Sequence, residues 1–150
     1  MKIFGIKIQV WFKRNNFNIC DINAMGEYGN TPLIQAAREG NISILKELLE
    51  LDAQLDIVND SGNSALWNAC FSDSYECFET LIHAGCNINT QNVNGITCLM
   101  YCACTGKEKF VQLLLDNHAN TELENIDGFK AIDLAVTTKI VALLKNANLS

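Results

Sequence analysis

The sequence predicts an all-α repeat solenoid, a single domain over residues 1–150 built from stacked helix-turn-helix units. Three observations predict this fold. Glycine recurs at a constant spacing of 33 residues, at Gly29, Gly62, Gly95 and Gly128. Small residues align with small and large with large in that register, and the second half of each unit carries an apolar stripe of helical periodicity. A fixed period of roughly 20–50 residues is the signature of a stacked-repeat fold.

The register divides the chain into full repeats at 29–61, 62–94 and 95–127, between an N-terminal cap at 1–28 and a C-terminal capping repeat at 128–150. Each repeat should open on a β-turn tip. The first helix should then begin after a hydroxyl N-cap, Thr31, Ser64 or Thr97, because that side chain can accept a bond from an orphan backbone amide. Gly40 and Gly106 should end the first helix in a left-handed conformation.

The second helix of each repeat is predicted from an i, i+1, i+4, i+5 apolar pattern, which burial of one helical face requires. The pattern begins at Ile44 and returns at Cys77 and Phe110. Asp73 and His118 stand at helix ends where glycine would be usual. Both residue types tolerate positive φ, so we expect mild strain there and not a break.

The two ends of the chain depart from the repeat. A helical stripe in residues 1–16 would contain Phe4, Ile8, Trp11 and Phe12, whereas Ile6, Ile8 and Val10 would equally make a strand. We favour a helical cap, because terminal repeats of a solenoid are atypical and cover its core. At the other end, residues 130–135 and 139–145 should form two closing helices with a shortened turn between them.

The repeat resembles the ankyrin-repeat family. The match is best at GNTPLIQAAREG (29–40) and LIHAGCNIN (81–89), and it extends over roughly residues 20 to 145. The sequence keeps the motif proline only at Pro32, and the motif histidine is replaced, for example by Trp67. The resemblance implies a module that binds another protein through its turn tips and the inner face of its first helices.

On that basis the register assigns the partner-binding positions. They are Tyr28, Arg38, Asn68, Phe71, Val93, Ile96, Tyr101, Cys104, Ile126 and Phe129, with a charged rim of Glu27, Glu39, Asp60 and Asp127. Several tip positions are apolar where a solvated turn would be polar, and exposed apolar clusters usually mark interaction sites. We expect a binding face centred on Phe71, Tyr101, Ile96 and Phe129, since aromatic anchors often dominate binding energy. Alternatively, Ile96 and Phe129 fold back as core.

Seven cysteines raise the question of a metal site. Cys98, Cys102 and Cys104 have a zinc-like spacing, but no second matching pair follows. Cys70, Cys86 and Cys102 occupy positions where other repeats hold alanine, so we expect small buried groups there. The register predicts partial exposure at Cys104. The sequence contains no catalytic motif. We therefore predict no metal, no cofactor and no enzymatic activity.

Charge restricts the class of partner. Residues 1–25 carry four basic and one acidic side chain, and the remaining residues carry seven basic and sixteen acidic ones. An acidic solenoid lacks the basic footprint of a nucleic-acid binder and would attract a basic protein. No segment approaches the ~20 apolar residues that span a bilayer, and no signal peptide is evident. We expect a cytoplasmic protein that is monomeric alone.

The leading hypothesis for function is stoichiometric inhibition. The sequence resembles small bacterial ankyrin proteins that serve as immunity partners of toxins, which implies neutralisation of a basic toxin or enzyme. A secreted ankyrin effector and a general adaptor or scaffold are the alternatives. A cysteine-based metal-binding protein is a further one, and it would use Cys98, Cys102 and Cys104.

Overall fold

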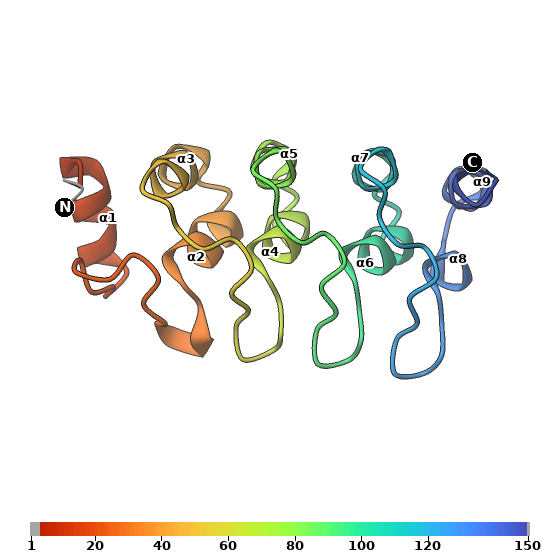
Figure 1. The fold of residues 1–150 in the computed structure, drawn as a ribbon, viewed down its shortest axis with the longest axis horizontal. Coiled ribbons are helices and arrows are strands. Elements are labelled where there is room, and N and C mark those ends of the chain that lie inside the picture. The colour runs from red at the N-terminus through yellow and green to blue at the C-terminus, as the bar shows by residue number, and fades with distance from the viewer. Residues whose placement is uncertain (1–3, 150) are drawn as a thin grey trace. The chain divides into compact units, whose positions relative to one another are not determined.

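The computed structural model describes residues 4–149, and within that range its regular structure is entirely helical, as the sequence predicts. The chain forms two compact units, Met1–Cys86 and Asn87–Ser150. In each unit taken by itself, first helices form one layer and second helices form another, and the connecting loops extend beyond the first helices (Figure 1).

Unit 1 contains a terminal helix and two helix pairs. Its elements are α1 (Ile6–Arg14), the 3-10 turn η1 (Glu27–Gly29), α2 (Pro32–Glu39), α3 (Ile42–Glu50), α4 (Ala65–Phe71) and α5 (Tyr75–His83). The first helices α2 and α4 pack together, and so do the second helices α3 and α5. The Ser72 hydroxyl donates to the carbonyl oxygen of Ala37 at 2.9 Å, which ties the end of α4 to α2.

Unit 2 contains two helix pairs. Its elements are α6 (Cys98–Cys104), α7 (Glu108–Asp116), α8 (Ala131–Leu134) and α9 (Thr138–Ala147). Packing again joins first helix to first helix, α6 to α8, and second to second, α7 to α9. The backbone N–H of Val136 donates to the carbonyl oxygen of Ala103 at 3.2 Å, so the close approach of the first helices is fixed by main-chain bonding.

The predicted N-caps are confirmed. The Thr31, Ser64 and Thr97 hydroxyls accept bonds from the backbone amides three residues later, at 3.3, 3.3 and 3.2 Å respectively. Each of these side chains is buried, so a substitution by alanine would leave the amide without this acceptor. The hydroxyls therefore fix where each first helix begins, and with it the direction in which the preceding tip points.

The predicted helix ends are confirmed as well. Gly40 and Gly106 adopt φ of 67° and 73°, and Asp73 and His118 adopt 59° and 63°. The left-handed residue lets the chain reverse between the two layers. Asp and His therefore replace glycine at these reversals, as the sequence predicts.

The N-terminal cap is helical, so the alternative of a strand is wrong. Ile8, Trp11 and Phe12 form the buried stripe of α1. The Trp11 indole N–H donates to a carboxylate oxygen of Glu39 at 2.9 Å, and Lys7 donates to the Ser43 hydroxyl. Helix α1 therefore covers the ends of both α2 and α3. Residues 1–3, which the sequence also assigns to this cap, lie outside the described residues.

The C-terminal capping repeat has a first helix of only one turn, α8. Lys130 stands where the other repeats place a hydroxyl, and a carboxylate oxygen of Asp133 accepts its backbone N–H at 2.9 Å. The Lys130 ammonium also pairs with Glu122 at 2.6 Å, which lowers the pKa of the Glu122 carboxyl. Helix α8 ends where the backbone becomes extended at Ala135, and α9 begins soon after at Thr138.

Candidate protein-binding surface

A repeated asparagine shapes the turn tips. In Asn59, Asn92 and Asn125, spaced by 33 residues, the side-chain oxygen accepts the backbone amides two and four residues later at 2.9 to 3.1 Å. Each asparagine thereby satisfies two amides of a tight loop that regular helix bonding cannot reach. The tips are thus fixed in shape, and the residue between the two bonded amides is a glycine at positive φ, Gly62, Gly95 or Gly128.

Within each unit, main-chain bonds join neighbouring tips. The Asp60 N–H donates to the Tyr28 carbonyl at 3.0 Å in unit 1, and the Ile126 N–H donates to the Asn94 carbonyl at 3.1 Å in unit 2. At Gly95 an added Cβ would lie 3.0 Å from backbone atoms of the next tip, so only glycine fits there without displacement. The tips of each unit therefore form a row held at a fixed spacing.

Unit 1 carries a hollow of about 360 Å³ between its turn tips and its first helices. Its lining residues are Tyr28, Arg38, Asn59, Asp60, Ser61, Asn63, Trp67, Asn68 and Phe71. Trp67 and Phe71, one turn apart on α4, stack with ring centroids 5.3 Å apart and planes 12° from parallel. Phe71 remains 51% exposed, and Tyr28 stands on the facing tip at φ 58°. The hollow therefore offers aromatic surface from both a helix and a tip.

The hollow contains both a cation and an anion. Arg38 and Asp60 are exposed, and in the described part of the chain the Arg38 guanidinium makes no ion pair or hydrogen bond. Glu39 differs, because its carboxylate oxygens already accept bonds from Trp11 and Gln35. Arg38 and Asp60 are therefore the charged groups available to a partner here, and Glu39 has a structural role at the cap.

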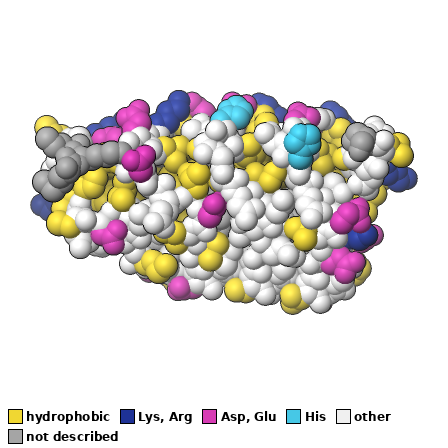
Figure 2. All heavy atoms as spheres, viewed as in Figure 1, with side chains coloured by type: hydrophobic (Ala, Val, Ile, Leu, Met, Phe, Trp, Pro, Cys, Tyr) yellow, Lys and Arg dark blue, Asp and Glu magenta, His cyan; other side chains and the backbone are white. Residues whose placement is uncertain are grey.

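Unit 2 presents aliphatic residues at its tips. Val93 and Ile126 are 65% and 71% exposed, and Phe129 is exposed by about half. Ile96 is half-buried, which lies between the predicted exposed position and the alternative in which the side chain folds back as core. In the space-filling view, hydrophobic side chains reach the edge formed by the loops, between polar ones (Figure 2). The apolar tips predicted from the sequence are exposed at Val93, Ile126 and Phe129.

Comparison with known proteins identifies the family. The pattern described as Ankyrin repeats (3 copies) matches residues 6–92 and 81–150. The chain belongs to the ankyrin-repeat family. Ankyrin repeats are protein–protein interaction modules, so the tips and first helices described above are the surface to consider for a partner.

Individual relatives agree with this assignment. An ankyrin repeat protein of Acanthamoeba polyphaga mimivirus is 29% identical over 83% of this chain and 17% of its own length. Ankyrin repeat and SOCS box protein 11 of Danio rerio is 30% identical over 78% of this chain and 40% of its own. Ankyrin repeat and SOCS box protein 3 of Bos taurus is 30% identical over 61% of this chain and 18% of its own length. The chain thus spans less than half the length of these relatives.

The structure corrects one predicted site residue, Asn68. Its side chain is only 3% exposed, and its amide group donates to the Ser64 carbonyl at 2.9 Å. The residue lies at the floor of the hollow and braces the first turn of α4. The ankyrin register places it on the inner face, but burial against the neighbouring helix leaves it little surface to offer a partner.

The remaining predicted residues fall into two sets. Tyr28, Arg38 and Phe71, with Glu27, Glu39 and Asp60, belong to unit 1, while Val93, Ile96, Tyr101, Cys104, Ile126, Phe129 and Asp127 belong to unit 2. In unit 2, Tyr101 is half-buried, with the Lys107 ammonium 6.0 Å from its ring centroid, and Cys104 is exposed as predicted. That the two sets form one continuous face stays a prediction.

Trp67 is the site residue that the sequence prediction missed. It occupies the position of the family histidine, and in the sequence it stands out only as a departure from the motif. Aromatic residues at i and i+4 on a helix lie side by side, so the spacing of Trp67 and Phe71 was the available signal. The 33-residue spacing of Asn59, Asn92 and Asn125 could equally have identified the tip asparagines.

The cysteines of these ankyrin repeats are mostly core residues. Cys70, Cys77, Cys98 and Cys102 are buried, whereas Cys86, where a small buried group is predicted, is only half-buried. Burial raises the pKa of the Cys77 thiol, and burial together with nearby Asp56 raises the pKa of the Cys86 thiol to about 12. Over residues 4–149, no group of three or more His, Cys, Asp or Glu side chains is placed to hold a metal ion.

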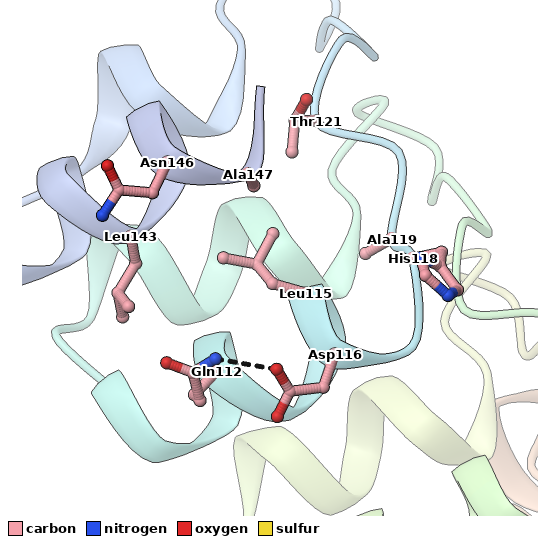
Figure 3. Close-up of a pocket in the computed structure, with 9 residues that line it drawn as sticks. All are labelled: Gln112, Leu115, Asp116, His118, Ala119, Thr121, Leu143, Asn146 and Ala147. Atoms are coloured by element: carbon pink, nitrogen blue, oxygen red, sulfur yellow. Dashed lines mark hydrogen bonds between the residues drawn. The ribbon is translucent and has the colours of Figure 1, made fainter. Parts of the chain in front are cut away.

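A second hollow, of about 610 Å³, lies in unit 2 between α7 and α9 (Figure 3). Leu115 of α7 and Leu143 of α9 contribute its apolar walls, and Gln112 donates to the Asp116 carboxylate at 2.8 Å across its floor. It belongs to the layer of second helices, away from the tips of the ankyrin repeats. None of the described helices has the length and apolar character to cross a membrane.

Proposed function

We propose that this ankyrin protein binds another protein through its turn tips and first helices. The hollow of unit 1 carries the proposal, because Tyr28, Arg38, Asp60 and Phe71 line it together and are all positions that the repeat register assigns to a partner. A hollow with an exposed aromatic wall can receive one side chain of a partner. Anchors of that kind, packed in a desolvated pocket, dominate the affinity of many interfaces.

The charge of the chain supports a basic partner. The net formal charge is −6, and Glu27 and Asp60 lie exposed at the tips beside the hollow. Charges at the rim of an interface raise the association rate and exclude like-charged proteins more than they raise affinity. A basic surface would therefore be drawn to the tips, while Arg38 would select a carboxylate or carbonyl oxygen near the anchor.

The mode of action proposed first is stoichiometric inhibition. One chain would bind one molecule of a toxin or enzyme in the cytoplasm and cover its functional surface, as an immunity protein does. The second candidate is an adaptor. It is favoured by the relatives, in which the region matched by this chain occupies 17 to 40% of a longer protein.

Affinity capture with matched variants tests the binding surface. The informative variant is Tyr28→Asn with Phe71→Ala, because Asn tolerates the positive φ of Tyr28 and both side chains are exposed. The control is Gln54→Ala with His83→Ala, two exposed positions of unit 1 outside the hollow. We expect one protein to be captured in near-equal amount by wild type and control and to be lost with the hollow variant. Equal capture by all three would place the interface elsewhere.

A titration then separates the two modes of action. If the chain is an inhibitor, the captured protein loses its activity in linear proportion to added chain, up to one equivalent. If it is an adaptor, the captured protein stays active at saturation and a second protein joins the complex. The hollow variant should shift either titration to higher concentration.

A further inference from the structure

The terminal helix α1 exposes an apolar surface on the side that faces away from the repeats. Its inner stripe of Ile8, Trp11 and Phe12 is buried, yet Ile6 on the outer side is 82% exposed and Val10 is exposed by about half. Two apolar faces on one nine-residue helix exceed what packing against α2 and α3 requires. The outer face therefore needs an explanation separate from the fold.

The same side of α1 is hollowed. A cavity of about 450 Å³ opens there, and we name the surface that lines it the cap face. Its residues are Gln9, Val10, Phe12, Lys13, Phe17 and Ile19. The Phe17 ring lies 5.7 Å from the rings of both Trp11 and Phe12, and it stacks on Trp11 with planes 26° apart. The aromatic cluster gives the cavity a packed floor, because the Phe17 ring joins the loop after α1 to the rings of the helix.

The apolar side chains of the cap face lie together. Val10 of α1 is gathered there with Phe17 and Ile19 of the loop that follows the helix. Contiguous apolar surface on a soluble protein marks an interaction site more often than chance exposure.

Charge indicates what covers the cap face. Lys13 lines the cavity, and Arg14 lines the adjoining hollow that shares Val10 with it. Both are exposed, and among residues 4–149 neither side chain forms an ion pair. These cations stand in a chain whose residues after 25 are strongly acidic. An occupant with carboxylates flanking an apolar stripe would satisfy both the cavity and the two cations.

Two other occupants fit less well. A second copy of this chain offers acidic helices, but the apolar stripes of α3 and α5 are already buried in its own core. An anionic membrane would also attract Lys13 and Arg14. A layer of lipid headgroups, however, has no apolar side chain that could fill a cavity of about 450 Å³.

We infer that the cap face is a second docking surface, which binds an acidic amphipathic helix of a partner protein. One or two apolar side chains of that helix fill the cavity over Phe12 and Phe17, and its carboxylates pair with Lys13 and Arg14. This surface is separate from the hollow beside Tyr28 and Phe71. The chain could then hold two proteins, one at the tips and one at the cap face.

Amide chemical-shift mapping on the ¹⁵N-labelled full chain tests the inference. The probe is a synthetic 18-residue helical peptide with leucine at i, i+3, i+4 and i+7 spacing and glutamate on its polar face. Its matched control carries lysine in place of every glutamate. We expect the acidic peptide at low salt to shift the amides of Val10, Lys13 and Ile19, and the basic peptide to leave them unmoved.

Charge reversal provides the second arm. Lys13→Glu with Arg14→Glu should weaken the acidic peptide at least tenfold while the circular dichroism spectrum is unchanged. Val10→Ser should weaken it without altering charge. Lys145→Glu, an exposed lysine of α9, is the matched control and should bind as wild type does. The Tyr28→Asn/Phe71→Ala variant should also bind the peptide, so failure of the proposed function and failure of this inference are distinguishable.

Three results would overturn the inference. The first is equal binding of the acidic and basic peptides, or no shift with either at millimolar concentration. The second is self-association in sedimentation velocity that Val10→Ser abolishes, which would make a second copy the occupant. The third is a preference of the same residues for phosphatidylserine-containing vesicles over the acidic peptide.

Discussion

The two units share one framework, by which we mean the helix pairs and the backbone of the turn tips, but the side chains that they expose differ. Unit 1 offers an aromatic pair, Trp67 and Phe71, on the side of a first helix above a hollow. Unit 2 offers Val93 and Ile126 at the ends of its tips, more than half exposed to solvent. Both units contain tip loops that an asparagine closes by accepting two backbone amides, Asn59 in unit 1 and Asn92 and Asn125 in unit 2. The repeats therefore differ where side chains face solvent and agree where the backbone must be satisfied.

The difference shows which positions of a repeat are free to specialise. The tip asparagines and the left-handed glycines are required by the backbone geometry, which is the same in both units. A residue such as Val93 or Ile126 is mostly exposed to solvent, so packing within its own unit does not fix its type. Framework substitutions should consequently reduce stability, and surface substitutions should reduce binding. Substitutions at each kind of position test that division.

The largest effect on the framework is expected at Gly95. An alanine there would be strained at φ 72°, and its Cβ would lie 3.0 Å from the backbone of Asn125 and Ile126. Strain and clash together should cost about 3 kcal/mol of unfolding free energy. Gly128→Ala is the matched control, since it has φ 82° but open space around the added Cβ, and strain alone should cost about 1 kcal/mol. Urea unfolding of both variants measures the difference, and equal losses would show that the tips can shift apart.

The next effect concerns the two surfaces. With the captured partner in hand, Tyr28→Asn with Phe71→Ala should weaken binding about 100-fold, which corresponds to about 2.7 kcal/mol. Val93→Ser with Ile126→Ser should weaken it about tenfold, because an aliphatic tip buries less area than an aromatic anchor in a hollow. Isothermal titration calorimetry measures both. A larger loss from the unit 2 pair would reverse the proposed ranking of the two surfaces.

The sequence alone predicted the framework well, for a physical reason. A period of 33 residues repeats the same local requirements, so the register itself locates the hydroxyls of Thr31, Ser64 and Thr97 and the reversals at Gly40 and Asp73. The N-terminal cap was harder, since its pattern fitted both a helix and a strand. Burial of Trp11 together with its bond to Glu39 decides for the helix, and that contact lies 28 residues away in sequence.

The site was predicted less completely. Exposure at Phe71 and Ile126 followed from register, but register cannot tell that Asn68 turns under its own helix to bond Ser64. It also cannot tell that the carboxylate of Glu39 is engaged by Trp11 of the cap. Side-chain direction depends on neighbours that differ from repeat to repeat, so a pattern of positions leaves it undetermined. The hollow is therefore a property of the structure.

A moderate effect is expected at the tip asparagines. Asn125→Ala removes the acceptor of the Asp127 and Phe129 amides, which are bonded at 3.0 Å each. Loss of both bonds at an exposed loop should cost about 1–2 kcal/mol. Asn146→Ala, at an exposed position of α9, is the control and should change stability little. Amide hydrogen exchange should accelerate at Asp127 and Phe129 in the first variant only; unchanged exchange would mean that the loop holds its shape without the asparagine.

An effect confined to alkaline pH separates core from surface chemistry at Cys86. Burial, with Asp56 as the second cause, raises the pKa of this thiol from 9.0 to about 12 in the folded chain. The folded state therefore holds the proton more tightly than the unfolded state. The stability that arises from this difference in thiol pKa is fully present below pH 9 and is lost as pH rises toward 12. Other repeats hold alanine at the aligned positions Ala53 and Ala119, so Cys86→Ala should fold normally.

Thermal unfolding from about pH 7 to about pH 11 checks this expectation. Wild type and Cys86→Ala should lose stability together up to about pH 9, because their other titrating groups are the same. Above that value the melting temperature of wild type should fall more steeply, since only wild type must ionise a half-buried thiol on unfolding. Parallel curves throughout would show that water reaches Cys86 freely. The position would then behave as surface, and the division between framework and surface would have to be redrawn at the end of α5.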